Sequence, residues 1–286
     1  MASDNRFAVL IDADNVSVKY IKIILDEISK DGIATYKRIY GDWTNPSLIS
    51  WKSTLLDNSI IPVQQYSYTT GKNSTDSAMI IDAMDILYSS RVEGFCLVSS
   101  DSDFTRLAAR LRESGMTVIG MGESKTPNSF IAACNKFKYL DILSAADEAE
   151  AEEAAPKAEP AKKPAAQPKK TAQKAAAKKP KEEPKAEKEP KPAEPKKQQE
   201  KAIEEPRTSL RTIRRALRTI VRENSDEDNW IMVSQVGNLL DKRYTDFDVR
   251  NFGFSKLTPF LESLDMFEIK DMKKDSSSPQ KYVRLK

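Results

Sequence analysis

The middle of the chain limits its organisation more than any other feature. Residues 145–206 contain ten of the fifteen prolines, and most of the remainder is Ala, Lys and Glu. A stretch with so few large apolar side chains cannot bury enough surface to offset the entropy that folding would cost. Its 15 Lys and 14 Asp/Glu are interspersed, which favours a solvated spacer over a basic binding tail. We therefore predict a disordered linker at 145–206 between a domain at 1–144 and a domain at 207–286.

In the first domain, short apolar runs alternate with segments of helical periodicity. Continuous apolar strands that alternate with helices predict an α/β fold, with a Rossmann-like parallel sheet covered by helices on both faces. The predicted strands are 7–11, 35–40, 60–66, 95–98 and 117–120, and the predicted helices are 18–29, 48–57, 76–88, 104–113 and 129–137.

The C-terminal domain has a different pattern. Apolar residues recur at helical spacing within 210–221, and further helices are predicted at 236–240 and 257–264, after a short strand-like run at 230–233. The apolar runs 267–269 and 282–285 are predicted to pair as a hairpin. Three helices followed by a β-hairpin indicate a small winged-helix (α+β) domain, a common way to present a helix and a hairpin to nucleic acid.

The chain contains no histidine. This excludes Ser/His/Asp triads, Cys/His proteases, histidine-ligated metals and imidazole acid–base catalysis, so any chemistry must use carboxylates, Lys, Tyr, Ser or metal-activated water. The two cysteines, Cys96 and Cys134, lack metal-ligand spacing and are predicted to be reduced residues of the core.

The start of the chain shows neither a secretion signal nor a membrane segment. The apolar run at 7–11 is too short for either. We therefore expect a soluble, cytoplasmic protein that does not enter a membrane.

Acidic and polar residues follow several of the predicted strands. Asp12, Asp14 and Asn15 follow the first strand. The segment 99–103 (SSDSD) follows the fourth strand, and Asp76 begins the helix after the third. In an open parallel sheet, loops at the carboxyl ends of the strands face one crevice, so these groups should converge. Each residue alone could instead be an ordinary helix cap. Three acidic loops at one edge of a sheet nevertheless favour a metal site over caps.

Carboxylates that converge repel one another unless a cation lies between them, and oxygen ligands suit Mg²⁺ or Mn²⁺. Such an ion can hold a phosphodiester, activate water and neutralise the leaving oxygen without any histidine. Two further aspartates on the helix after the third strand, Asp82 and Asp85, do not share a face with Asp76. We interpret Asp82 as a supporting group and Asp85 as a surface residue.

Three segments of the first domain together resemble the NYN domain. They are 9–15 (VLIDADN), 72–76 (KNSTD) and 98–104 (VSSDSDF), and the similarity continues through 106–108 and the strand near 115–122. Many family members have Lys-Gly-Val-Asp where this chain has KNSTD, but the aspartate is retained. The resemblance implies a PIN-like, LabA-type nuclease that cleaves RNA with Mg²⁺ or Mn²⁺.

The same resemblance implies roles for individual residues. Four aspartates would bind the metal, and a neighbouring Asn and Ser would orient the ligands or the phosphate. The implied catalytic residues are Asp12, Asp76, Asp101, Asp103, Asn15 and Ser99, of which Asp12, Asp76, Asp101 and Asp103 are the implied metal ligands.

The C-terminal domain resembles the LOTUS (OST-HTH) domain, through Trp230, Phe247-Asp248 and 253–257 (GFSKL). The resemblance implies a winged helix that binds RNA in several relatives and proteins in others. Residues 207–286 hold 16 Lys/Arg against 12 Asp/Glu, whereas residues 1–144 hold 15 against 17. The candidate phosphate contacts are Lys72, Arg214, Arg215, Arg218, Arg250 and Lys256; for the arginines and Lys256, a solvated basic face is an equal alternative.

Two competing functions remain open. Residues 12–16 (DADNV) also fit the Asp-x-Asp-x-Val start of a HAD-type phosphatase, although no cap domain is inserted and the fourth strand lacks that family's acidic element. A non-catalytic regulator that binds RNA or protein is the other alternative. We expect a metal-dependent ribonuclease whose C-terminal module recruits RNA, with a protein partner of that module as an open possibility.

Overall fold

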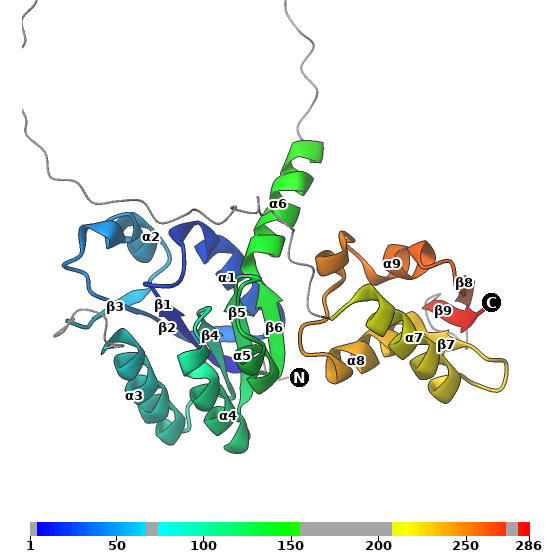
Figure 1. Cartoon of the computed structure of the whole chain (residues 1–286), viewed down its shortest axis with the longest axis horizontal. Helices are drawn as coiled ribbons and strands as arrows, with labels where there is room; N and C mark the ends of the chain where they lie inside the picture. Colours follow the sequence, from blue (N-terminus) through cyan, green and yellow to red (C-terminus); the bar gives the residue numbers. More distant parts are fainter. Residues whose placement is uncertain (1–4, 67–73, 155–207, 273–279) are drawn as a thin grey trace, which may run out of the picture. The chain divides into compact units, whose positions relative to one another are not determined.

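The computed structural model describes residues 5–66, 74–154, 208–272 and 280–286. In the first domain, six strands form one sheet in the order β3-β2-β1-β4-β5-β6 (Figure 1). Every neighbouring pair is parallel, as the uninterrupted apolar runs predicted. The strands are β1 (Arg6–Asp12), β2 (Ile33–Gly41), β3 (Ile61–Gln64), β4 (Gly94–Val98), β5 (Thr117–Gly122) and β6 (Lys136–Tyr139).

Helices cover both faces of this sheet (Figure 1). One face packs against α1, α2 and the start of α6, and the other against α3, α4 and α5. Short 3₁₀ turns η1 (Val18–Tyr20), η2 (Pro46–Leu48) and η3 (Ser102–Phe104) precede three of the helices. The helices are α1 (Ile21–Asp31), α2 (Trp51–Asp57), α3 (Ser74–Ser89), α4 (Thr105–Glu113), α5 (Asn128–Ala133) and α6 (Leu140–Ala154).

The central strand β1 shows why the fold is layered. Successive side chains point to opposite faces, so Val9 and Ile11 join the core under α1, whereas Ala8 and Leu10 join the core under α3. All four are fully buried. A strand that is apolar on both faces must be covered by helices on both faces, so β1 lies at the centre of the sheet. The carboxyl end of β1 therefore lies midway along the carboxyl edge of the sheet.

The sixth strand was not predicted. The single helix expected at 129–137 is wrong: α5 ends at Ala133, and β6 begins at Lys136. The overlooked signal is strict alternation, because Phe137 and Tyr139 are buried while Lys136 and Lys138 are less so.

The helix that follows β6 enters the predicted linker. Helix α6 continues to Ala154, ten residues beyond the predicted boundary at 144. Ala and Glu, which dominate this stretch, are strong helix formers even without a core to pack on. The remainder of the predicted linker, 155–206, lies outside the described residues.

The C-terminal domain confirms the predicted order of helices followed by a β-hairpin. Helix α7 (Leu210–Asn224) is followed by the short strand β7 (Ile231–Met232). This strand and the two hairpin strands form an antiparallel sheet in the order β7-β9-β8. The other elements are α8 (Val233–Arg243), η4 (Val249–Phe252), α9 (Leu257–Ser263), β8 (Phe267–Met272) and β9 (Gln280–Leu285).

Two expectations from composition can also be compared with the structure. Cys96 and Cys134 are both buried and free, as predicted for reduced core residues. Across the described ranges, none of the helices combines the length and apolar character that crossing a bilayer requires.

The core of the C-terminal domain gives a first test. Phe260 is fully buried, and its ring lies 5.2 Å from that of Phe252 and 5.6 Å from that of Phe254. We expect Phe260→Ala to lower the free energy of unfolding by about 3–5 kcal/mol, because it removes apolar contacts and leaves a cavity. Urea unfolding of the full chain measures this decrease. The exposed Lys270→Ala is the control, and an equal decrease in both variants would contradict the assigned core.

Candidate functional site

The candidate site lies where the chain changes from one face of the sheet to the other. The neighbouring strands β1 and β4 pair in parallel, with Ile11 opposite Val98. Asp12 is the residue after Ile11, and Ser99 is the residue after Val98. The chain leaves β1 toward α1 on one face and reaches β4 from α3 on the other. Such a switch point opens a crevice at the carboxyl edge of the sheet, where α/β proteins bind ligands.

Three aspartates converge in this crevice. Asp76 lies in the first turn of α3, and Asp101 and Asp103 lie in the loop that joins β4 to α4. One carboxylate oxygen from each lies within 4.8 Å of the others. Asp101 also caps η3, because its Oδ1 accepts a hydrogen bond of 2.9 Å from the backbone N–H of Asp103. Asp101 therefore both caps η3 and lies in the acidic cluster.

Asp12 lies outside this 4.8 Å group and is fully buried. Its carboxylate accepts hydrogen bonds from the backbone N–H of Asp14 (3.0 Å), from Asn15 Nδ2 (2.8 Å) and from Ser99 Oγ (2.7 Å). Burial raises the pKa of Asp12, while the hydrogen bonds from Asn15 and Ser99 act in the opposite direction. Asp12 is thus a rigidly held acidic group beside the three converging aspartates.

Ser99 connects the two halves of the site. Its hydroxyl donates to Asp12 and accepts a hydrogen bond of 3.1 Å from the backbone N–H of Asp101. The end of β5 packs directly on Ser99, because a β-carbon at Gly122 would lie only 2.6 Å from the carbonyl oxygen of Ser99. A glycine is needed there so that the loop after β5 can approach Ser99.

A further hydrogen bond fixes the start of α3. Thr75 Oγ1 donates to Asp14 Oδ2 over 2.9 Å, which joins the loop after β1 to the helix that carries Asp76. Thr75 is buried, whereas Asp14 is exposed. Sequence reasoning did not single out Thr75 or Gly122. The available signal was their position beside the acidic motifs.

Electrostatics indicates which kind of ligand suits the cluster. Burial and, after it, the negative charges of Asp12, Asp101 and Asp103 together raise the pKa of Asp76 to about 6. The carboxylate is therefore destabilised mainly by reduced hydration and by like charges. An all-oxygen ligand set under this repulsion fits a divalent cation such as Mg²⁺ or Mn²⁺.

The aspartates of α3 lie in three different environments. The register of Asp76 is retained despite the KNSTD departure, because this residue reaches Asp101 and Asp103. Asp82 instead pairs with Arg38 and accepts a hydrogen bond from Tyr40, so it does not support Asp76. Asp85 is exposed on α3, as predicted.

The candidate phosphate contacts fall into three groups. Lys72 lies outside the described residues. Arg214, Arg215 and Arg218 are exposed on α7, and Lys256 is exposed before α9. Arg250 differs from these residues, because its guanidinium is bound by Glu27 and Asp248 and is only 23% exposed. A phosphate at Arg250 would therefore compete with two carboxylates.

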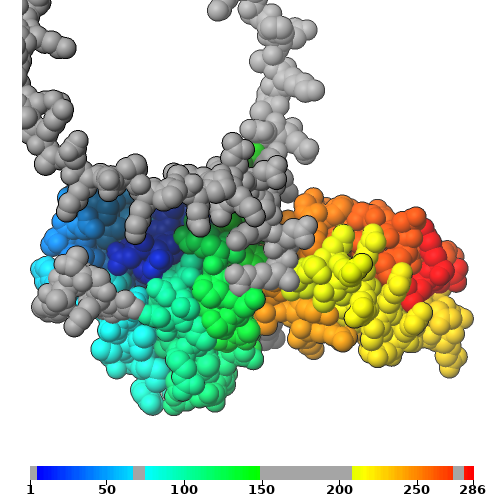
Figure 2. All heavy atoms as spheres, in the orientation of Figure 1, coloured from blue at the N-terminus to red at the C-terminus, as the bar shows by residue number. Residues whose placement is uncertain are grey.

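The arginines of α7 form a larger set than predicted. Each of five arginines lies three or four residues from another one, so all five share one face of the helix. All are exposed, and within the described part of the chain none of them pairs with an acidic side chain. Figure 2 shows α7, in yellow, at the open surface of the C-terminal domain. The set, called the α7 arginine face below, is Arg211, Arg214, Arg215, Arg218 and Arg222.

Fold and site together define a PIN-like α/β domain joined to a winged-helix domain. The NYN domain family matches residues 6–141, and the OST-HTH/LOTUS domain family matches residues 207–278. The chain is therefore an NYN-domain protein with a C-terminal OST-HTH domain, as the resemblance implied. The NYN assignment replaces the HAD alternative.

Comparison with individual proteins adds little. A crystal structure of a protein of unknown function from Vibrio parahaemolyticus is 17% identical, covers 49% of this chain and 94% of its own, and has a TM-score of 0.42. No curated protein matches the chain.

Substitution of one converging aspartate tests the metal interpretation. We expect Asp101→Asn to weaken Mn²⁺ binding by more than roughly tenfold, because a charged ligand is removed. Asn retains an oxygen that can accept the hydrogen bond from Asp103, so η3 should persist. Isothermal titration with Mn²⁺ measures the affinity. Asp85→Asn, an exposed aspartate on α3, is the matched control, and equal affinities in the two variants would rule out Asp101 as a ligand.

Proposed function

We propose that this protein is a metal-dependent ribonuclease that hydrolyses RNA phosphodiester bonds at the aspartate cluster of its NYN domain. The observation that carries the proposal is the convergence of Asp76, Asp101 and Asp103 at the switch point of the sheet. The NYN domain belongs to the PIN-like nuclease superfamily, which supports action on nucleic acid. The OST-HTH domain supports RNA as the substrate.

Each residue of the site has a defined part in this proposal. Asp76, Asp101 and Asp103 would hold Mg²⁺ or Mn²⁺. When bound, such an ion supplies Lewis-acid activation of the phosphodiester and of the attacking water. Asp12 holds a carboxyl group in a fixed position beside the ligands, since three hydrogen bonds orient it.

Ser99 and Asn15 act as positioning residues. Ser99 joins Asp12 to the backbone of Asp101, and Asn15 donates to the same oxygen of Asp12, Oδ2, that Ser99 binds. Both orient the acidic groups before the substrate arrives, which reduces the reorganisation needed during the reaction.

The α7 arginine face is the RNA-recruiting surface in this proposal. Its five guanidinium groups line one exposed side of a helix of 15 residues. Guanidinium groups bind phosphate through paired hydrogen bonds, and they remain charged at any physiological pH. A row of such groups suits the regularly spaced phosphates of an RNA strand.

The central test is cleavage of labelled single-stranded RNA by the purified full chain with Mn²⁺ or Mg²⁺. We expect Asp76→Asn and Asp101→Asn each to lower the cleavage rate by more than about 100-fold, since removal of a direct ligand should exceed the effect typical of an outer partner. Asp85→Asn should cleave at the wild-type rate.

Two results would count against the proposal. Undiminished cleavage by both variants would assign the activity to another site or to a contaminant. A wild-type chain that binds RNA but does not cleave it under any metal condition would support the non-catalytic regulator.

The recruiting surface has its own test. We expect the combined Arg214→Gln, Arg215→Gln and Arg218→Gln variant to bind single-stranded RNA more weakly. The slope of log affinity against log salt should fall by roughly 2, since each neutralised phosphate of a single strand adds about 0.7 to that slope. Fluorescence anisotropy at several salt concentrations measures both quantities. Arg6→Gln, at an arginine already paired with Glu93, is the control, and an unchanged slope in the triple variant would remove α7 from the RNA interface.

A further inference from the structure

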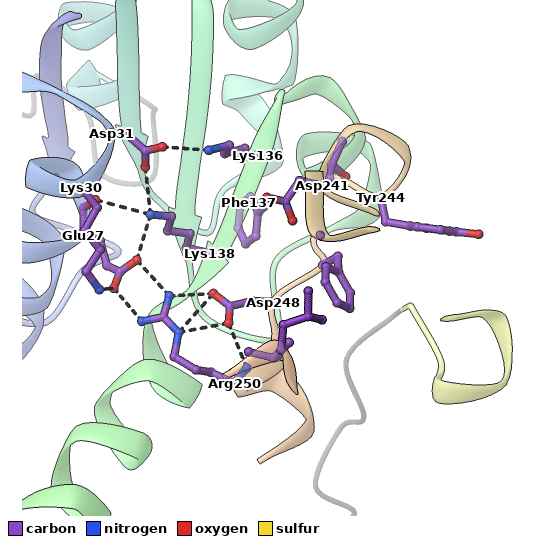
Figure 3. A pocket seen from close by; sticks show the side chains of 15 residues that line it. Glu27, Lys30, Asp31, Lys136, Phe137, Lys138, Asp241, Tyr244, Asp248 and Arg250 are labelled. Atoms are coloured by element: carbon purple, nitrogen blue, oxygen red, sulfur yellow. Dashed lines mark hydrogen bonds and ion pairs between the residues drawn. The ribbon is translucent and has the colours of Figure 1, made fainter. Parts of the chain in front are cut away.

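Glu27 of α1 is a buried carboxylate that the proposed reaction does not use. It is 3% exposed, yet three cationic side chains contact it. Lys30 Nζ lies at 2.5 Å, Lys138 Nζ at 2.8 Å, and Arg250 at 2.6 Å through one guanidinium nitrogen and 3.0 Å through the other (Figure 3). Lys30 and Lys138 belong to the NYN domain, whereas Arg250 belongs to the OST-HTH domain.

Arg250 is prepared for this contact within its own domain. Asp248 caps η4 by accepting the backbone N–H of Arg250 at 2.9 Å, and the same carboxylate binds the guanidinium at 2.6 Å and 3.0 Å. The guanidinium is therefore held between two carboxylates, one from each domain (Figure 3). A planar group fixed in this way binds Glu27 with two parallel hydrogen bonds, which a lysine could not reproduce.

A second set of contacts lies along the edge strand β6. The backbone N–H of Phe137 donates to the carbonyl oxygen of Thr245 over 2.7 Å, and the hydroxyl of Tyr139 donates to Asp246 over 3.3 Å. Asp246 is only 6% exposed. An edge strand that exposes backbone donors tends to pair with other chains unless it is covered. Here Thr245 of the OST-HTH domain accepts one of these backbone donors, the N–H of Phe137.

The charges around these contacts are balanced. A hollow of about 330 Å³ beside the Glu27–Arg250 ion pair is lined by four cationic and four anionic side chains. Equal numbers of both signs argue against a phosphate site and fit an ionic interface. The cationic side chains are Lys30, Lys136, Lys138 and Arg250, and the anionic ones are Glu27, Asp31, Asp241 and Asp248.

We propose that the Glu27–Arg250 ion pair and the β6 contacts hold the OST-HTH domain on the NYN domain as one unit. The described residues of the two domains cluster as one compact unit. The OST-HTH domain is then not an independently moving module. This inference goes beyond the proposed nuclease function, since it requires neither a metal nor RNA.

The distance between the domains tests this proposal directly. Asp85→Cys and Lys270→Cys place one exposed labelling site in each domain, whereas Cys96 and Cys134 are fully buried. With spin labels at these sites, pulsed electron resonance of the full chain should give one narrow distance distribution. Adding Glu27→Gln or Arg250→Gln should broaden it several-fold.

Matched variants separate docking from folding. Arg284→Gln removes an arginine from an exposed ion pair with Glu268 inside the OST-HTH domain, and it should leave the distribution narrow. Glu27→Gln changes only the NYN domain, so broadening in this variant cannot come from an unfolded OST-HTH domain. A distribution that is already broad in the otherwise unchanged chain, or that stays narrow in both Glu27→Gln and Arg250→Gln, would overturn the proposal.

Discussion

The hydrogen bond between Ser99 and Asp12 is the interaction on which the candidate site depends. It joins the ends of the two central strands at 2.7 Å, and both side chains are fully buried. The same Ser99 oxygen accepts from the backbone N–H of Asp101, so the position of the β4–α4 loop follows from the position of β1. A buried polar pair of this kind is costly to break and therefore fixes one geometry. The sheet therefore determines where the converging aspartates lie.

Most of the fold could be predicted from the sequence because its strands are buried on both faces. The apolar runs of β1 and β4 are too continuous for any other environment, and the helices between them show clear periodicity. The sixth strand was not predicted, because β6 has only four residues and lies at an edge of the sheet, where buried and less buried side chains alternate. The interval 129–137 satisfied a helical pattern over its first half, and only the packing of Phe137 and Tyr139 separates the two halves.

The acidic site could be predicted for a similar reason, whereas the basic surface could not. Strand ends in a parallel sheet share one edge, so Asp76 and Asp101 were brought together by topology alone. No comparable rule locates an arginine. Arg250 and Arg215 look equivalent in the sequence, yet Arg250 is bound by Glu27 and Asp248, whereas Arg215 lies on an open helix face. Only tertiary partners distinguish a structural cation from a binding cation.

Glu27 and Asp76 are both buried carboxylates, but their negative charges have opposite surroundings. Although burial acts to raise it, hydrogen bonds from Arg250, Lys138 and Lys30 hold the pKa of Glu27 well below its usual range. Burial and neighbouring carboxylates instead raise the pKa of Asp76 to about 6. The protein therefore compensates one charge with its own side chains and surrounds the other with charges of the same sign. Stability alone would favour the first arrangement everywhere. The second is intelligible if the compensating charge at Asp76 is a cation that comes from solution, as a metal-dependent nuclease requires.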